Sequence, residues 1–305
     1  MISKIKVTKF LVLPLVCVLV LSFGVNTETY ANDVRESITI DTFTSFTQEE
    51  LNSLSSKQIV EFTDYLSQLS EEELSDIGQE VWNKIIGLWQ RDSEEQSKYE
   101  LTKSLLDTEQ KPIELDPPGI RYDQSFSSAN WGQNGGGGSG IHEWDSSYST
   151  SSNRNNVWVE ATAVGYGYAN AATGIMISTD AWQANEAHEV DITFEGWTGW
   201  WMTTLGQDGA GSFDVDAYVY DLTNERYVGS TSIYSSDATI LWWDTEDFAE
   251  SIYTTLWGDR TYAIFINSHI LATAYWLDFP GYCQCESDTS SYHTNWGTIG
   301  FDWLN

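Results

Sequence analysis

Hydrophobic and polar residues alternate along the second half of the chain. Each alternating segment puts apolar side chains on one face and polar or charged side chains on the other, as antiparallel strands with one buried face do. The segments with strand character are 157–164, 188–195, 213–220, 226–234, 260–267, 270–279 and 296–303. Turn residues separate them. Residues 120–305 are therefore predicted to form a mainly β domain, an antiparallel and jelly-roll-like β-sandwich.

The segment before residue 112 has the period of helices. Three capping-box patterns start at Thr47, Ser55 and Ser70, each with Glu or Gln three residues later. Apolar residues then recur every three or four positions. This predicts one short helix and two longer ones near 56–69 and 71–91, with residues 92–111 able to continue as helix. Residues 32–111 are interpreted as a small α-helical leader, serving as a pro-segment or spacer.

Two further segments show neither a strand pattern nor a helix pattern. Residues 112–119 contain three prolines and end in glycine, so they are predicted to be the linker between leader and sandwich. Residues 130–156 are rich in Gly, Ser and Asn. They are predicted to begin with one strand and to continue as a long loop around the glycine run 135–138.

The first 31 residues have the order of a secretory signal peptide. Lysines at 4, 6 and 9 precede an apolar run, and Ala31 offers a small residue for cleavage. The apolar run is shorter than the roughly 20 residues of a membrane-spanning helix. We expect a secreted, extracellular protein with no membrane span after cleavage.

Charge narrows the choice of partners. The formal net charge is −31, and the 24 acidic residues after position 119 face only four arginines and no lysine. A surface of this kind repels phosphate groups, so nucleic acid is excluded as a partner. Adaptation to salt, cation binding and simple solubility all remain as interpretations.

Cys283 and Cys285 are the two cysteines after the predicted signal peptide. In an oxidising compartment we expect them to form a disulfide with each other or with another chain. Free thiols and a metal pair are the alternatives, although no second ligand pair of the usual zinc spacing accompanies them.

Aromatic residues supply the first candidate site. Of the 15 tryptophans, 13 lie after the linker, and two groups stand beside acidic residues. An exposed indole can stack on a sugar ring while nearby carboxylates accept its hydroxyl hydrogen bonds. The alternative is core filling. Since neighbouring residues of a strand point to opposite faces, one ring of each adjacent pair is expected in the core. The candidate ligand-binding residues are Trp197, Trp200, Trp201, Trp242 and Trp243.

Carboxylates supply two further candidates. Asp208, Asp214 and Asp216 surround a glycine turn, so calcium is the candidate cofactor. Glu189, Asp191 and Glu195 share one strand face. If their strand lay beside that of Asp214 and Asp216, two carboxylates would stand at a glycosidase separation. No sequence motif for a serine hydrolase or a zinc protease is present, and no catalytic residue is assigned.

Three functional hypotheses follow. The first is a secreted, non-enzymatic β-sandwich that binds glycan or another cell-surface ligand. The second is a secreted polysaccharide hydrolase with a helical pro-segment. The third is an exported protein that assembles with copies of itself, as toxins do. The aromatic residues and the lack of a catalytic motif favour the first hypothesis.

Overall fold

A computed structural model describes residues 38–117, 124–205, 209–238, 241–275 and 281–304. The predicted signal peptide, 1–31, lies outside the described residues, as do Pro118 and Gly119 of the predicted linker. Residues 37–305 belong to one compact unit. Within the described ranges, no helix is both long enough and apolar enough to cross a membrane.

The N-terminal part of the described chain is helical. All three predicted capping boxes are present, with each Ser or Thr side chain accepting from a backbone N–H three residues on. The predicted helix over 71–91 is divided, because the chain is not helical at 76–78, and the second part continues much further than residue 91. The helices are α1 (Ile40–Thr44), α2 (Gln48–Asn52), α3 (Ser56–Leu66), α4 (Glu71–Ser75) and α5 (Gln79–Leu106).

Strands make up most of the remaining chain. Four of them are longer than 15 residues. The strands are β1 (Ile113–Glu114), β2 (Gln124–Phe126), β3 (Trp131–Ser149), β4 (Arg154–Ser178), β5 (Ala187–Leu205), β6 (Gly209–Asp221), β7 (Arg226–Ala238), β8 (Trp242–Trp257), β9 (Thr261–Ala274), β10 (Gly281–Ser287) and β11 (Thr294–Leu304).

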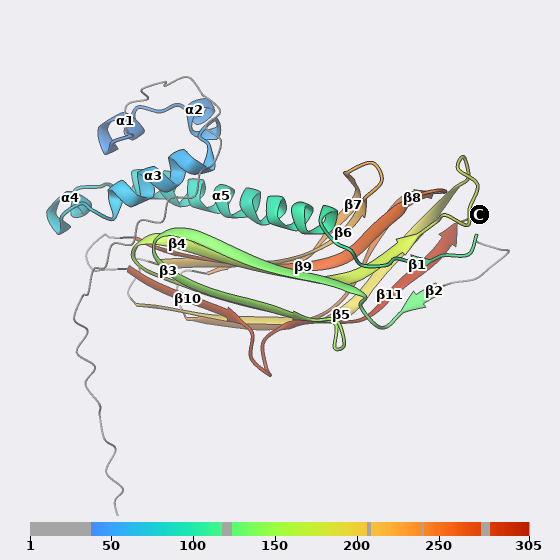
Figure 1. The fold of residues 1–305 in the computed structure, drawn as a ribbon. Coiled ribbons are helices and arrows are strands. Elements are labelled where there is room, and N and C mark those ends of the chain that lie inside the picture. The colour runs from blue at the N-terminus through green and yellow to red at the C-terminus, as the bar shows by residue number, and fades with distance from the viewer. Residues whose placement is uncertain (1–37, 118–123, 206–208, 239–240, 276–280, 305) are drawn as a thin grey trace, which may run out of the picture. The chain divides into compact units, whose positions relative to one another are not determined.

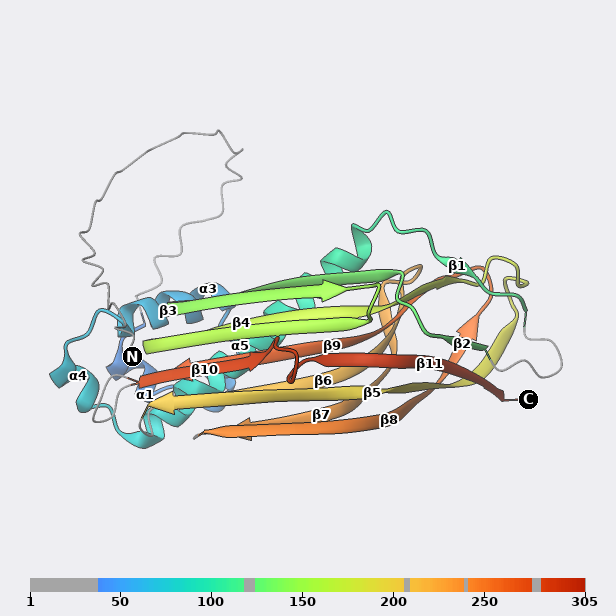
Figure 2. The same cartoon turned by 90° about the horizontal axis from the view of Figure 1, so that it is seen from below.

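The strands form two packed layers, which confirms the predicted antiparallel β-sandwich. One layer contains β8, β5, β10, β11 and the first half of β4. The other contains the second half of β4 with β9, β6 and β7. Figure 1 shows the two layers, and Figure 2 shows β3, β4, β10, β5 and β8 side by side in the first of them. Apart from β1 with β4, the described pairings are antiparallel.

The long β3–β4 hairpin belongs to both layers. It bends where a register shift follows Gly140 in β3 and where Ala163 of β4 has a φ of 62°. Gly140 itself has a φ of 75°, a conformation that glycine adopts without strain. The prediction that residues 130–156 are mostly loop was therefore wrong, because the glycine run lies inside strand β3 and pairs with β4 throughout.

The glycine run has a packing reason to be a strand. Because the β3–β4 hairpin bends at Gly140 and Ala163, the second half of β3 lies against its first half. Trp144 packs on Gly136, and Tyr148 packs on Gly132. A Cβ atom added to Gly136 would lie 2.6 Å from Cδ2 of the Trp144 indole. The glycines therefore make room for two aromatic rings from the same strand.

The main core lies between the two layers. It buries the inner faces of β4, β5, β6 and β9, and its largest side chains include Phe194, Trp200, Phe213 and Trp296. Each inner-face residue alternates with an outward one, as the period-two pattern predicts. The outer faces of the two layers do not take part in this core.

The helices cover the outer face of the layer formed by β4, β9 and β6. Tyr166 and Tyr168 of β4 and Leu271 of β9 share a buried cluster with the helices, and Leu101 and Leu105 of α5 pack near Phe265 in another. The division into a leader and a sandwich that fold independently, joined by residues 112–119, stays a prediction. In the structure the helices and the sandwich share buried surface.

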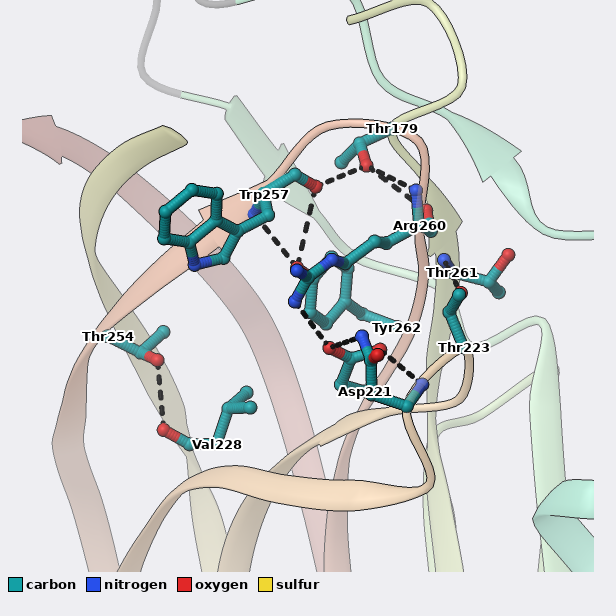
Figure 3. A network of polar contacts seen from close by, with 10 residues as sticks. Thr179, Asp221, Thr223, Val228, Thr254, Trp257, Arg260, Thr261 and Tyr262 are labelled. Atoms are coloured by element: carbon teal, nitrogen blue, oxygen red, sulfur yellow. Dashed lines mark hydrogen bonds and ion pairs between the residues drawn. The ribbon is translucent and has the colours of Figure 1, made fainter. Parts of the chain in front are cut away.

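A buried ion pair anchors the far end of this layer (Figure 3). Arg260 Nη1 lies 2.8 Å from Oδ2 of Asp221, whose side chain is fully buried. The same carboxylate accepts hydrogen bonds from the backbone N–H and the side-chain amide of Asn224. The Arg260 guanidinium also lies 5.5 Å from the centre of the Trp257 ring. A charged pair therefore closes the β6–β7 turn against the start of β9.

Candidate functional site

A row of aromatic and acidic residues crosses the outer face of the first layer. The strand register places Trp243 of β8 opposite Trp201 of β5, and Trp201 opposite Glu286 of β10. Glu286 in turn stands opposite Trp158 of β4, which stands opposite Asp145 of β3. Directly opposite residues have Cβ atoms about 5 Å apart, so these five side chains are successive neighbours. They are called the aromatic face below.

The aromatic face is accessible to solvent. Trp243 is 63% exposed, Asp145 is exposed, and Trp158, Trp201 and Glu286 are half-buried. The helices lie on the other layer, so none of them covers this face (Figures 1 and 2). A ligand can therefore reach three indoles in one row.

A second row of polar residues runs beside the first. Thr203 and Gln284 stand opposite each other, as do Gln284 and Glu160. The Tyr282 hydroxyl donates to Gln284 Oε1 over 2.7 Å, and Gln284 Nε2 donates to Glu286 Oε1 over 2.8 Å. Hydrogen bonds therefore hold the Glu286 carboxylate in place next to the indoles.

Burial and negative neighbours weaken the ionisation of these acids. Burial raises the pKa of Glu286, the Asp288 carboxylate adds to the rise, and a hydrogen bond from Trp201 opposes it. The pKa of Asp288 is raised by its burial and by Asp145. Burial and Glu160 raise the pKa of Tyr282 to about 12. The face is a site of concentrated negative charge with partly desolvated oxygens.

The predicted tryptophans fall into different environments. Trp201 and Trp243 belong to the aromatic face. Trp197 shares the outward side of β5, with its ring 4.9 Å from that of His293. Trp200 is fully buried and donates its indole N–H to the Tyr234 hydroxyl over 3.0 Å, so it is a core residue and cannot contact a ligand.

Trp242 departs from expectation. One ring of the Trp242–Trp243 pair was predicted to be buried, but both are exposed, at 44% and 63%. Trp242 does stand opposite the buried Met202. However, it is the first residue of β8, whose described pairing is with β5 alone. At this edge of the sheet the described residues leave its ring partly uncovered.

Sequence reasoning missed Trp158 and Glu286 as site residues. Trp158 lies in a segment that was correctly predicted as a strand, and its outward position follows from the alternation. The residues beside Trp158 on the neighbouring strands cannot be predicted from this alternation, because it does not tell that β10 lies between β4 and β5.

The predicted metal ligands are in a different layer. Asp208 lies outside the described residues. Asp214 and Asp216 point outward from β6 toward α5 and line a cavity of about 190 Å³ with Lys98, Asn267 and His269. Among the described residues no group of three or more His, Cys, Asp or Glu is arranged to hold a metal ion. Calcium stays a prediction.

This cavity holds buried ionisable groups. Burial raises the pKa of Asp214 to about 6, with further rises from Asp216, Asp237 and Glu94 and an opposing hydrogen bond from Ser235. Burial, and then Lys98, lowers the pKa of His269 to about 4.

These shifts predict a pH-dependent effect of Asp214→Asn. A raised carboxyl pKa contributes stability below pH 3.8 that is lost as the pH rises through 6. At pH 8 the ionised Asp214 therefore costs stability, and the asparagine variant should be about 1–2 kcal/mol more stable than the unmodified protein, after a discount for partial exposure. The lowered pKa of His269, which stands opposite Asp214, acts in the opposite direction in both proteins.

Denaturant unfolding of both proteins between pH 8 and pH 4 checks this. The advantage of the variant should shrink toward zero at the acidic end. A difference that does not change with pH would show that Asp214 has an ordinary pKa.

The strands of the candidate catalytic carboxylates are not neighbours. Glu189, Asp191 and Glu195 point outward from β5, whereas Asp214 and Asp216 point outward from β6 in the opposite layer. Because the strands belong to different layers, the core separates the two groups. The condition for a glycosidase site made from these residues is therefore not met.

Cys283 and Cys285 are buried as free thiols on the inner side of β10. Their sulfur atoms are 3.7 Å apart, whereas a disulfide bond is about 2.05 Å long. Burial raises the pKa of Cys285, which disfavours the reactive thiolate. A disulfide between them stays a prediction.

Comparison with known proteins adds no family. No protein-family model matches the chain, and no curated protein matches it. One similar solved structure is the CBM22-1 xylan-binding domain of Xyn10C from Paenibacillus barcinonensis, with 10% identity, a TM-score of 0.19, and coverage of 61% of this chain and 97% of that one. Another is a family 11 carbohydrate-binding module from Clostridium thermocellum in complex with a β-1,3-1,4-mixed-linked tetrasaccharide, with 12% identity, a TM-score of 0.16, and coverage of 52% and 93%. With scores this low, any function must be argued from the residues of this chain.

Proposed function

We propose that this protein is a secreted glycan-binding protein whose aromatic face binds an uncharged polysaccharide chain. The observation that carries the proposal is the alignment of Trp243, Trp201 and Trp158 with Glu286 and Asp145 across neighbouring strands. Secretion is proposed from the signal-peptide pattern of residues 1–31.

The dimensions of the row suit an oligosaccharide. Neighbouring strands are about 4.8 Å apart, so a row across five strands extends over roughly 19 Å. The apolar faces of sugar rings stack on indoles. We take each stacking contact to contribute about 1 kcal/mol, as a pair of stacked aromatic rings does. The Glu286 and Asp145 carboxylates can accept hydrogen bonds from sugar hydroxyls between those contacts.

Charge selects the class of sugar. Glu286, Asp288, Asp145, Glu160 and Glu143 gather on or beside the aromatic face, and no lysine occurs after position 111. Like charges brought together at an interface disfavour binding strongly. Polysaccharides that carry uronate or sulfate groups are therefore excluded, and neutral glucans, xylans, mannans or N-acetylated polymers are favoured.

A panel of soluble polysaccharides tests this proposal. Neutral polymers should retard the protein in affinity electrophoresis, whereas polygalacturonate and sulfated polymers should not. Trp201→Ala and Trp243→Ala should each weaken the retardation. Tyr253→Ala is the matched control, because Tyr253 is 61% exposed on the same sheet face at the other end of β8. Retardation by anionic polymers alone would contradict the proposal.

A hydrolase is the second candidate function, and one observation favours it. Glu286 is a diagonal neighbour of Glu160 on adjoining strands, at a Cα separation of about 7–8 Å. A pair of carboxylates near that spacing, one with a raised pKa, can act as acid and base in glycoside hydrolysis. Release of reducing ends from a retained polymer, lost in Glu286→Gln, would establish turnover at the same face.

A further inference from the structure

A second group of exposed aromatic residues lies on the other side of strand β3. Trp144 and Tyr148 pack on Gly136 and Gly132, yet their rings remain 41% and 42% exposed. Each ring uses one face for packing on the glycine strand, and that packing fixes its orientation. Four residues apart on one strand, the rings stand roughly 13 Å from each other.

These rings form one wall of a groove against helix α5. The groove has a volume of about 540 Å³, and the glycines of β3 line its floor. Glu100, Lys103 and Asp107 of α5 form the opposite wall. Small-ligand sites combine aromatic side chains with a few hydrogen-bonding groups, and this groove offers both.

Buried polar atoms at the groove lack partners. Gln133, which lines it, is only 6% exposed, and no described residue hydrogen-bonds its Nε2. Burial raises the pKa of the Glu100 carboxyl group, and hydrogen bonds from Tyr168 and Asn170 oppose the rise. By hydrogen-bond geometry, its Oε2 has no partner among the described residues. An unpaired buried polar group destabilises the folded protein. A ligand with several hydroxyl groups can supply the missing donor and acceptor.

We propose that this groove is a second saccharide-binding site, separate from the aromatic face. Sugar rings stack on the exposed faces of Trp144 and Tyr148, and their hydroxyls pair with Gln133 and Glu100. Glu100 and Asp107 outnumber Lys103, so an uncharged sugar is favoured here too. The proposal does not depend on the aromatic face, because the two sites use different side chains.

Packing alone would also place aromatic rings on glycines, so the test must detect the ligand at the ring. The indole N–H of Trp144 gives its own NMR signal, which a Trp144→Phe variant identifies. The probe is a panel of neutral tetrasaccharides, namely cellotetraose, xylotetraose, mannotetraose and N-acetylchitotetraose, titrated into the full secreted chain. We expect at least one of them to shift this signal saturably.

Variants separate the two sites. The shift at Trp144 should persist in the Trp201→Ala/Trp243→Ala double variant and should weaken at least fivefold in affinity in Tyr148→Ala. Tyr99→Ala is the control, because Tyr99 is 64% exposed on α5 and lines none of the cavities described above. Thermal unfolding of each variant shows that it is folded.

The outcomes are distinct. If the Trp201 and Trp243 signals shift while that of Trp144 does not, up to the solubility limit of every tetrasaccharide, the groove is a packing feature and this inference is overturned. If only Trp144 shifts, the groove is the saccharide site and the aromatic face is not. A Trp144 shift that disappears in the double variant would also overturn an independent site.

Discussion

Replacing Trp200 by alanine should lower the free energy of unfolding by about 3–5 kcal/mol, the usual cost of truncating a fully buried tryptophan. The indole packs on Phe213 with ring centres 5.8 Å apart. Its N–H donates to Tyr234, whose hydroxyl donates to Asp244 over 2.9 Å. The substitution leaves a cavity and also removes a donor from this chain of hydrogen bonds.

Trp201→Ala is the matched control for this prediction, because the neighbouring residue is of the same type and points to the opposite face. Its half-exposed ring should contribute less than half as much to stability. Urea unfolding of both variants measures the difference. Equal losses would mean that Trp201 is as much a core residue as Trp200, and the aromatic face would lose its central member.

Replacing Arg260 by methionine should destabilise the protein by a similar amount, about 3–5 kcal/mol, because it leaves the buried Asp221 carboxylate without its countercharge. The N–H groups of Asn224 remain as donors, but they carry no full positive charge. Methionine keeps most of the apolar length of the side chain that lies near Trp257.

A second substitution isolates the charge effect. Asp221→Asn in the Arg260→Met background removes the uncompensated charge while the side-chain oxygen can still accept from Asn224. The double variant should recover part of the lost stability in urea unfolding. If Arg260→Met alone costs less than about 1 kcal/mol, the ion pair behaves like an exposed one and the buried-charge account is wrong.

The elements that the sequence predicted well are those whose signals are local. Capping boxes such as Ser55–Gln58 satisfy backbone groups three residues away, and they formed as expected. Alternation in 157–164, 188–195 and 213–220 reports burial on one face, and these segments lie in β4, β5 and β6.

The elements that the sequence did not reveal depend on distant partners. Glycine has a poor strand propensity. Strand β3 depends on its pairing with β4 and on contacts such as those of Trp144 and Tyr148, which pack on Gly136 and Gly132. Residues 260–267 and 270–279 were predicted as two strands. Residues 261–274 form the single strand β9, where the polar His269 lines a cavity beside α5 rather than lying in a turn.

The candidate site shows the same limit. Trp201 and Trp243 were identified from composition, since aromatic residues beside acids are visible in the sequence. Their alignment with Trp158 and Glu286 requires β10 to pair with both β4 and β5, a long-range register that no local pattern encodes.

The most direct test of the central claim is a calorimetric titration. A neutral oligosaccharide from the class that retards the protein is titrated into the unmodified chain and into Trp201→Ala/Trp243→Ala. Loss of two stacking contacts of about 1 kcal/mol each should weaken the affinity roughly thirtyfold, while the thermal unfolding temperature stays close to that of the unmodified protein. Equal affinity for both proteins would show that the ligand does not bind at the aromatic face.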